Sequence, residues 1–220
     1  MRDVCDVFVD PDGLVFDSKN VQGHKTKEDA DYEGVRIKFL GFLERSRIPM
    51  QIDVGFGDIV YPKTRVIDYP VILDFPKPHL KGYPVESVIS EKFEAMVKLG
   101  LLNSRMKDFY DIWLMMRQFD FNGSNLAEAL KRTFEHRKTD LPKAPPLFAK
   151  EIYDERSDRQ TLWKAFLRKD DLKHAPEKLA MTAKEIENFL IKPLNAVKKS
   201  QEFEGKWKAP GPWEFVGDNT

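Results

Sequence analysis

The chain has 220 residues, 41% of them hydrophobic and 12% aromatic, which is enough for one good-sized domain or two small ones. Its 36 basic and 36 acidic residues cancel, so a protein coated in positive charge for non-specific nucleic-acid binding is excluded, although a local basic patch is not. The lone Cys5 excludes an internal disulfide and a cysteine-rich zinc site. No apolar run reaches the ~18 to 20 residues of a membrane span, and no apolar signal segment opens the chain. We therefore expect a soluble cytoplasmic protein with no membrane contact.

The first part of the chain predicts a small sheet. Asp10-Pro11-Asp12-Gly13 is a turn signal whose acidic residues are better explained as turn formers than as metal ligands, and Leu14 to Phe16 follows as a short strand. Residues 17–33 are polar and predict a loop with a short helical piece. Val35 to Leu43 alternates as a strand largely covered on both faces, and Ile48 to Val54 alternates after a turn. The last two segments predict an antiparallel hairpin.

Asp53 stands inside the second strand of that hairpin, on the face opposite its apolar row. Because Asp is among the poorest strand formers, Asp53 is either an edge residue facing water or a carboxylate fixed beside a site. The bend predicted by Gly55-Phe56-Gly57-Asp58 favours a site at that rim.

The rest of the chain predicts helices. Prolines between Pro62 and Pro84 exclude a long helix there, so Val71 to Leu73 is at most a short edge strand. Five helices are expected, the last with Thr182 and Glu185 as a capping box, and they cover residues 85–99, 107–119, 124–137, 159–167 and 182–191.

The expected fold class is α+β, a mixed sheet followed by a helical C-terminal half. We expect three portions, a sheet portion over 1–82, a helical portion over 83–195 and a partly disordered tail over 196–220. The tail carries isolated Trp207 and Trp213 among lysines, which predicts a segment that docks on its own domain or frays.

Two of the predicted helices carry charge on their apolar faces. Lys92 projects from the centre of a stripe that includes Ile89, Phe93 and Met96, and Asp108 shares a face with Ile112. Since a buried charge costs several kcal/mol unless it is paired or used, two interpretations stay open. Lys92 and Asp108 are either an ion pair bracing two helices or part of a site. An open site, which we expect, predicts that Lys92→Met leaves stability unchanged or raises it.

Four motifs occur in order, Tyr32-x-Gly34-Val35-Arg36-Ile37, Gln51-Ile52-Asp53-Val54-Gly55-Phe56-Gly57-Asp58, Glu91-Lys92-Phe93-x-Ala95 and Ser104-Arg105-Met106-Lys107-Asp108-Phe109-x-Asp111. In this pattern the chain resembles the AbiEii/AbiGii nucleotidyltransferase toxins of type IV toxin–antitoxin pairs, named for abortive phage infection. The resemblance implies a polymerase-β-like fold, Mg²⁺ as cofactor, and transfer of a nucleotidyl group from a nucleoside triphosphate to an RNA acceptor such as tRNA. It also implies a cognate antitoxin protein as partner.

The resemblance also implies residue roles. Asp53 is expected as the strand carboxylate nearest the acceptor, assisting deprotonation or binding the metal, and Lys92 as a point charge on the triphosphate. Asp108 is expected to orient Lys92 or to complete the polar floor of the site. The remaining nucleotide-binding residues are expected to be Arg105, Lys107 and Asp111. We expect Asp53, Lys92 and Asp108 to converge in one cleft.

One departure from the family pattern affects the expected activity. The family's first motif, a Gly-Ser pair followed by an Asp-x-Asp metal clamp, is not supplied by Met1 to Asp12, where Asp3 and Asp6 are wrongly spaced. We expect either a shortened chain or one that has lost the clamp, and no catalysis by this chain alone. The alternative is a non-catalytic homologue that acts as a protein-binding module, engaging the antitoxin.

Overall fold

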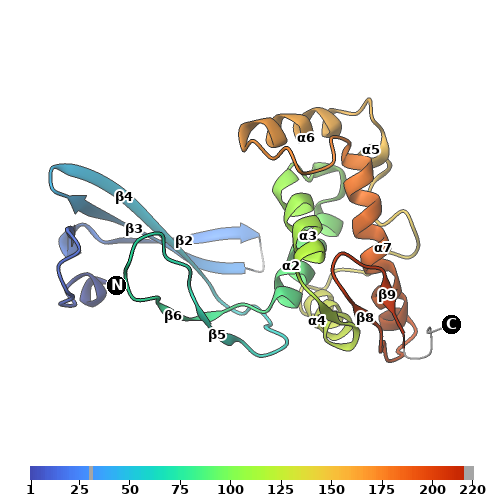
Figure 1. The fold of residues 1–220 in the computed structure, drawn as a ribbon, viewed down its shortest axis with the longest axis horizontal. Helices are drawn as coiled ribbons and strands as arrows, with labels where there is room; N and C mark the ends of the chain where they lie inside the picture. Colours follow the sequence, from blue (N-terminus) through green and yellow to red (C-terminus); the bar gives the residue numbers. More distant parts are fainter. Residues whose placement is uncertain (30–31, 216–220) are drawn as a thin grey trace. The chain divides into compact units, whose positions relative to one another are not determined.

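A computed structural model describes residues 1–29 and 32–215. The chain divides into two compact units, Met1–Asp58 and Ile59–Thr220, which are described separately below. The class is α+β with a helical C-terminal half, as predicted (Figure 1). The two units are separated after Asp58 because the residues of each unit contact mainly one another. This division does not test the expected portions 1–82, 83–195 and 196–220, which stay a prediction.

The first unit is an antiparallel sheet built around one long strand, β3. Its elements are α1 (Arg2–Cys5), β1 (Leu14–Phe16), the 3₁₀ turn η1 (Ser18–Asn20), β2 (Gln22–Asp29), β3 (Tyr32–Leu43) and β4 (Ser46–Gly55). Strand β4 pairs with β3 along its length, while β1 and β2 pair with successive parts of β3. The predicted hairpin is therefore confirmed, with Gly34 opposite Gly55 and Leu43 opposite Ser46.

One expectation for this unit is wrong. The polar stretch 17–33 was expected to be a loop with a short helical piece. The 3₁₀ turn η1 supplies that piece, but Gln22–Asp29 is a strand, because a solvent-exposed edge strand needs few apolar side chains. Strand β3 was expected to be largely covered on both faces, and most of its side chains from Val35 to Leu43 are buried or half-buried. Phe39 is buried, but Lys38 is exposed and Leu43 is 45% exposed.

The second unit begins with a two-stranded arm, β5 (Arg65–Asp68) paired with β6 (His79–Gly82). Val71 to Leu73, expected to be at most a short edge strand, forms no strand, and both Ile72 and Leu73 are exposed. Prolines on each side of this segment lack the N–H that a ladder requires, which explains its irregular backbone.

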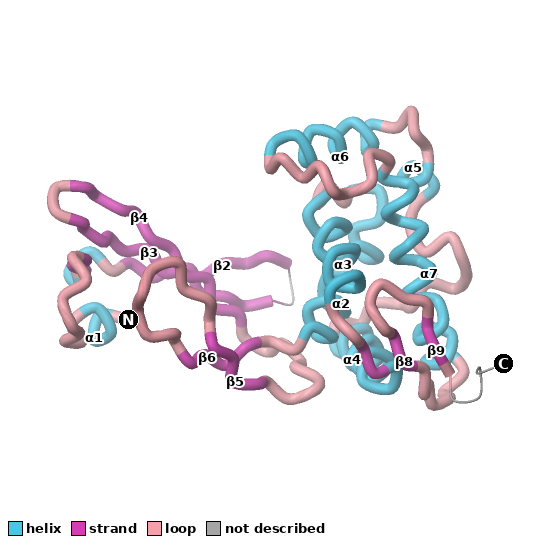
Figure 2. The backbone as a smooth tube through the Cα atoms, viewed as in Figure 1, coloured by secondary structure: helices cyan, strands magenta, loops and turns pink. Residues whose placement is uncertain are grey.

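Helices form most of the rest of this unit (Figure 1; Figure 2). Their bounds are α2 (Val85–Leu99), η2 (Gly100–Leu102), α3 (Met106–Gln118), α4 (Gly123–His136), α5 (Lys150–Tyr153), α6 (Asp158–Lys169) and α7 (Leu179–Lys198). Helix α2 packs on α3 and α4, and α7 packs on both of these as well. The five predicted helices are all present. Their shared core includes Phe93, Phe109, Ile112, Leu130 and Phe189.

The capping box expected at Thr182 and Glu185 is wrong. Helix α7 begins at Leu179, and Thr182 is fully buried inside it. The Glu185 carboxylate instead accepts a hydrogen bond of 2.8 Å from Nε1 of Trp113 on α3. Burial of Leu179 against the core extends the helix beyond its local signal.

The segment after α7 docks on the helices. Strand β8 (Lys206–Trp207) pairs with β7 (Phe121–Asn122) and with β9 (Trp213–Glu214). Nε1 of Trp207 donates to the Met116 carbonyl at 2.6 Å, and both tryptophans are buried. Of the two alternatives for this tail, docking is therefore correct for the described part. The expectation of disorder at its end falls on residues 216–220, which lie outside the described residues.

Candidate functional site

The most unusual cluster of charge in the second unit surrounds Lys92. Its Nζ atom lies 2.8 Å from Oδ1 of Asp108 and 2.8 Å from Oδ2 of Asp111. The side chains of these three residues are 23%, 11% and 18% exposed, respectively. The ammonium group is thus held between two carboxylates and still reaches solvent.

Helix geometry brings these groups together. Lys92 lies near the middle of α2, which packs against α3. Asp108 and Asp111 are three residues apart near the start of α3, so their side chains lie on one face. The Oδ1 atom of Asn103 accepts a hydrogen bond of 2.8 Å from the Arg105 amide and so orders the chain as it enters α3.

The two carboxylates keep Lys92 charged. Burial alone lowers the pKa of the ammonium group, because it disfavours the charged form. Hydrogen bonds from Nζ to Asp108 and Asp111 outweigh this effect and hold the pKa above its ordinary value. Lys92 is therefore a permanent cation at neutral pH.

Two further cations lie at the start of α3. Lys107 Nζ is 2.6 Å from Oδ2 of Asp111, and its side chain is 71% exposed. Arg105, the residue before the helix, is exposed. The cluster therefore has an inner cation, Lys92, and an outer pair that remains accessible to an anion.

Asp53 lies on β4 of the first unit and faces water. The Arg36 guanidinium binds it with two hydrogen bonds, Nε at 2.7 Å and Nη2 at 3.1 Å, and Gln51 Nε2 adds a third at 3.0 Å. The bonds from Arg36 hold the Asp53 pKa below its usual range, so the carboxylate stays ionised. Arg36 was missed as its partner, although the hairpin register places the two residues opposite each other.

The structure brings together only part of the predicted site. Lys92, Asp108 and Asp111 meet, and Lys107 joins them through Asp111. Asp53 belongs to the other unit, so its convergence with Lys92 stays a prediction.

The described residues do not fit Mg²⁺ on their own. Mg²⁺ in nucleotide sites is held by one or two free carboxylates together with substrate phosphates. Asp53 is engaged by Arg36, and Asp108 and Asp111 are engaged by Lys92. Within residues 1–29 and 32–215, no group of three His, Cys, Asp or Glu side chains could hold a metal ion.

Sequence reasoning also missed a second ion pair on α2. Arg137 Nη1 lies 2.8 Å from Oε2 of Glu94, whose side chain is only 2% exposed, and the Thr139 hydroxyl also donates to this carboxylate. Arg137 further approaches Glu91 at 3.7 Å. Because residues 92 and 94 project from nearly opposite sides of a helix, α2 carries an ionic contact on both sides.

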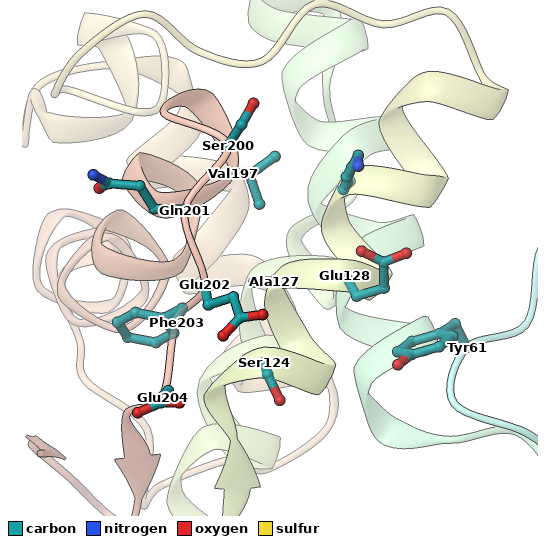
Figure 3. Close-up of a pocket in the computed structure, with 11 residues that line it drawn as sticks. Tyr61, Ser124, Ala127, Glu128, Val197, Ser200, Gln201, Glu202, Phe203 and Glu204 are labelled. Atoms are coloured by element: carbon teal, nitrogen blue, oxygen red, sulfur yellow. The ribbon is translucent and has the colours of Figure 1, made fainter. Parts of the chain in front are cut away.

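A separate cavity of about 480 Å³ lies between α4 and the segment after α7 (Figure 3). Its lining includes Tyr61, Glu128, Glu202 and Glu204, with Lys131. An excess of carboxylates disfavours an anionic ligand, and neither Lys92 nor Asp108 lines this cavity. It is not the phosphate site expected from the sequence.

The order of motifs on β3, β4, α2 and α3 can now be compared with known families. The family model described as nucleotidyl transferase AbiEii toxin, type IV TA system, matches residues 1–190. This chain belongs to the AbiEii family. No curated protein and no solved structure matches it. In the part of this AbiEii chain that the structure describes, no helix is both long and apolar enough to cross a membrane.

Proposed function

We propose that this AbiEii chain binds a nucleoside triphosphate at Lys92 and serves in nucleotidyl transfer to an RNA acceptor, for which metal ligands must come from outside the described residues. One observation carries the proposal. An ammonium group has three N–H donors, and Lys92 uses two of them on Asp108 and Asp111. The third donor, on a side chain that is 23% exposed, is available to a phosphate oxygen.

The aspartates position the cation in this proposal. Lysine is a flexible point charge, and two hydrogen bonds fix its head group where a phosphate can reach it. Lys107 and Arg105 supply accessible positive charge at the same end of α3, which raises the local concentration of an anionic substrate.

The reaction joins an acceptor oxygen to the α-phosphorus and breaks the bond from that phosphorus to the bridging oxygen. Pyrophosphate leaves with the electron pair, and the acceptor hydroxyl loses its proton. Asp53, held ionised by Arg36, is proposed to assist this deprotonation by accepting a hydrogen bond from the hydroxyl, whose proton passes to solvent. Lys92 is proposed to stabilise negative charge on the phosphates. Both substrates belong to the cytoplasm, which we infer as the place of action.

Triphosphate binding tests the proposal. A phosphate contact by a charged donor is worth about 1.5 to 3 kcal/mol, so Lys92→Met is expected to weaken ATP binding roughly 10- to 100-fold in a calorimetric titration. Lys131→Met, which removes an exposed lysine from α4, is the control and leaves the affinity unchanged. Arg105→Gln and Lys107→Gln are each expected to weaken binding a few-fold without loss of folding. Unchanged ATP affinity in a folded Lys92→Met variant and in both outer variants overturns the proposal.

A second candidate function, docking of the cognate antitoxin, is favoured by the arm that β5 and β6 form. Ile72 and Leu73 at its tip are 102% and 66% exposed, and Val66 on β5 is 68% exposed. Exposed apolar side chains in one segment are typical of protein interfaces. In gel filtration with the antitoxin, Ile72→Asp with Leu73→Asp is expected to abolish co-elution, whereas Met181→Asp on α7 retains it. Co-elution by the double variant contradicts this candidate.

A further inference from the structure

The sheet of the first unit has a polar face on which rows of side chains cross three strands. Residues directly opposite each other in antiparallel strands point to the same side of the sheet. One row consists of Gln22, Lys38 and Gln51, and the next consists of His24, Arg36 and Asp53. The row with Lys38 therefore lies beside the row that carries the predicted catalytic carboxylate.

A hollow of about 460 Å³ opens over the first of these rows. Three residues with amide side chains, Asn20, Gln22 and Gln51, line it together with Lys38, and Phe39 and Met50 contribute to its wall as well. Leu40 and Pro49, the next cross-strand pair on this face, also line it. No carboxylate is among its lining residues.

The lining selects the chemistry of a ligand. Lys38 is exposed and has no ion-pair partner within the described ranges 1–29 and 32–215, so its charge is available to an anion. The amide of Gln22 is exposed as well, and Gln51 uses its Nε2 on Asp53, which leaves its oxygen as an acceptor. Amides that can both donate and accept are the groups that read nucleobase edges, and an unpaired lysine is a phosphate contact. The apolar pair beside this row, Leu40 and Pro49, offers a non-polar contact to the face of a base.

We propose that this hollow binds one nucleotide of a single-stranded RNA, with its phosphate on Lys38 and its base edge on Gln22 and Gln51. The inference rests on the proposed function, because Asp53 in the neighbouring row then lies beside the acceptor nucleotide. Lys38 is close enough for its charge to contribute to lowering the Asp53 pKa. A phosphate bound at Lys38 is thus within electrostatic reach of the carboxylate.

Fluorescence anisotropy of a labelled single-stranded RNA tests the site in the full chain. Lys38→Gln is expected to weaken binding about tenfold for every sequence and to reduce the slope of log affinity against log salt by about 0.7. Gln22→Ala is expected to change the ranking among RNAs that differ in one terminal base. Lys25→Gln is the matched control, since Lys25 is exposed on the neighbouring strand β2 and points to the other face of the sheet, and it is expected to change affinity less than twofold.

Each other outcome overturns the assignment. Equal losses for Lys38→Gln and Lys25→Gln indicate diffuse electrostatic attraction, and no loss for Lys38→Gln removes the phosphate contact. If Lys38→Gln weakens ATP binding and leaves RNA binding intact, the hollow binds a free nucleotide instead. These results are distinguishable from failure of the proposed function, which is measured by ATP binding to Lys92 variants.

Discussion

Replacing Lys92 by Met measures how much the charged cluster stabilises the second unit. The substitution removes the cation that neutralises Asp108 and Asp111, whose side chains are 11% and 18% exposed. Breaking a buried ion pair by removing one partner costs about 3 to 5 kcal/mol, and residual solvent access places this case near the lower end. We expect a fall of about 3 kcal/mol in the free energy of unfolding.

The assay is urea denaturation followed by circular dichroism, with Lys107→Met as the matched control. Lys107 also pairs with Asp111, but it is 71% exposed, so its removal is expected to cost about 0.5 kcal/mol or less. An unchanged midpoint for Lys92→Met refutes the reasoning, because it means that water solvates both carboxylates without the lysine. An open site, expected from the sequence, predicted that Lys92→Met would not lower the free energy of unfolding. Because Asp108 and Asp111 both lie 2.8 Å from Lys92, we now expect the substitution to lower it.

Three further predictions follow from the same contacts. Arg137→Met leaves the buried Glu94 carboxylate without its cation, so unfolding should become easier by about 3 to 5 kcal/mol, and a change below about 1 kcal/mol in urea contradicts the pairing. The pKa of Lys92 is raised on folding, so its stabilisation is fully present below the unfolded pKa of about 10.4 and is lost as pH rises through the folded value. The midpoint difference between parent and Lys92→Met should stay constant from about pH 6 to 9 and shrink above about 10.5, and a constant difference at high pH contradicts this. When the chain alone is incubated with Mg²⁺, labelled triphosphates and tRNA, we expect no detectable nucleotide transfer. Its described residues offer no group of ligands for the metal. Loss of a single group that stabilises transition-state charge already lowers the rate roughly 10²- to 10³-fold. Robust labelling refutes that expectation.

The helices and strands that could be predicted are those in which apolar residues recur with the spacing typical of a helix or a strand. Helix α2 matches its predicted bounds, since its apolar stripe and Pro84 are local signals. Strand β2 was missed because a polar edge strand has no apolar alternation. The two-residue strands β7, β8 and β9 form only because the buried tryptophans of the last segment dock on the helices.

In the candidate site, too, only residues with a local sequence signal could be predicted. Lys92 and Asp108 could be found from sequence, because each places a charge on an apolar helical face. The Arg36–Asp53 pair was accessible from the hairpin register, which sets the two residues opposite each other. Glu94 and Arg137 are 43 residues apart and share no periodic pattern, so only the packing of α2 on α4 brings them together.

The central claim is that a triphosphate contacts the Lys92 ammonium group. Lysine ammonium groups that are held by hydrogen bonds exchange slowly enough to be observed by ¹⁵N-edited NMR, and the Lys92 signal is assigned by its loss in Lys92→Met. Addition of ATP is predicted to shift this signal, with a smaller shift for the exposed Lys107. If ATP binds while the Lys92 signal stays in place, the triphosphate lies elsewhere and the account is wrong.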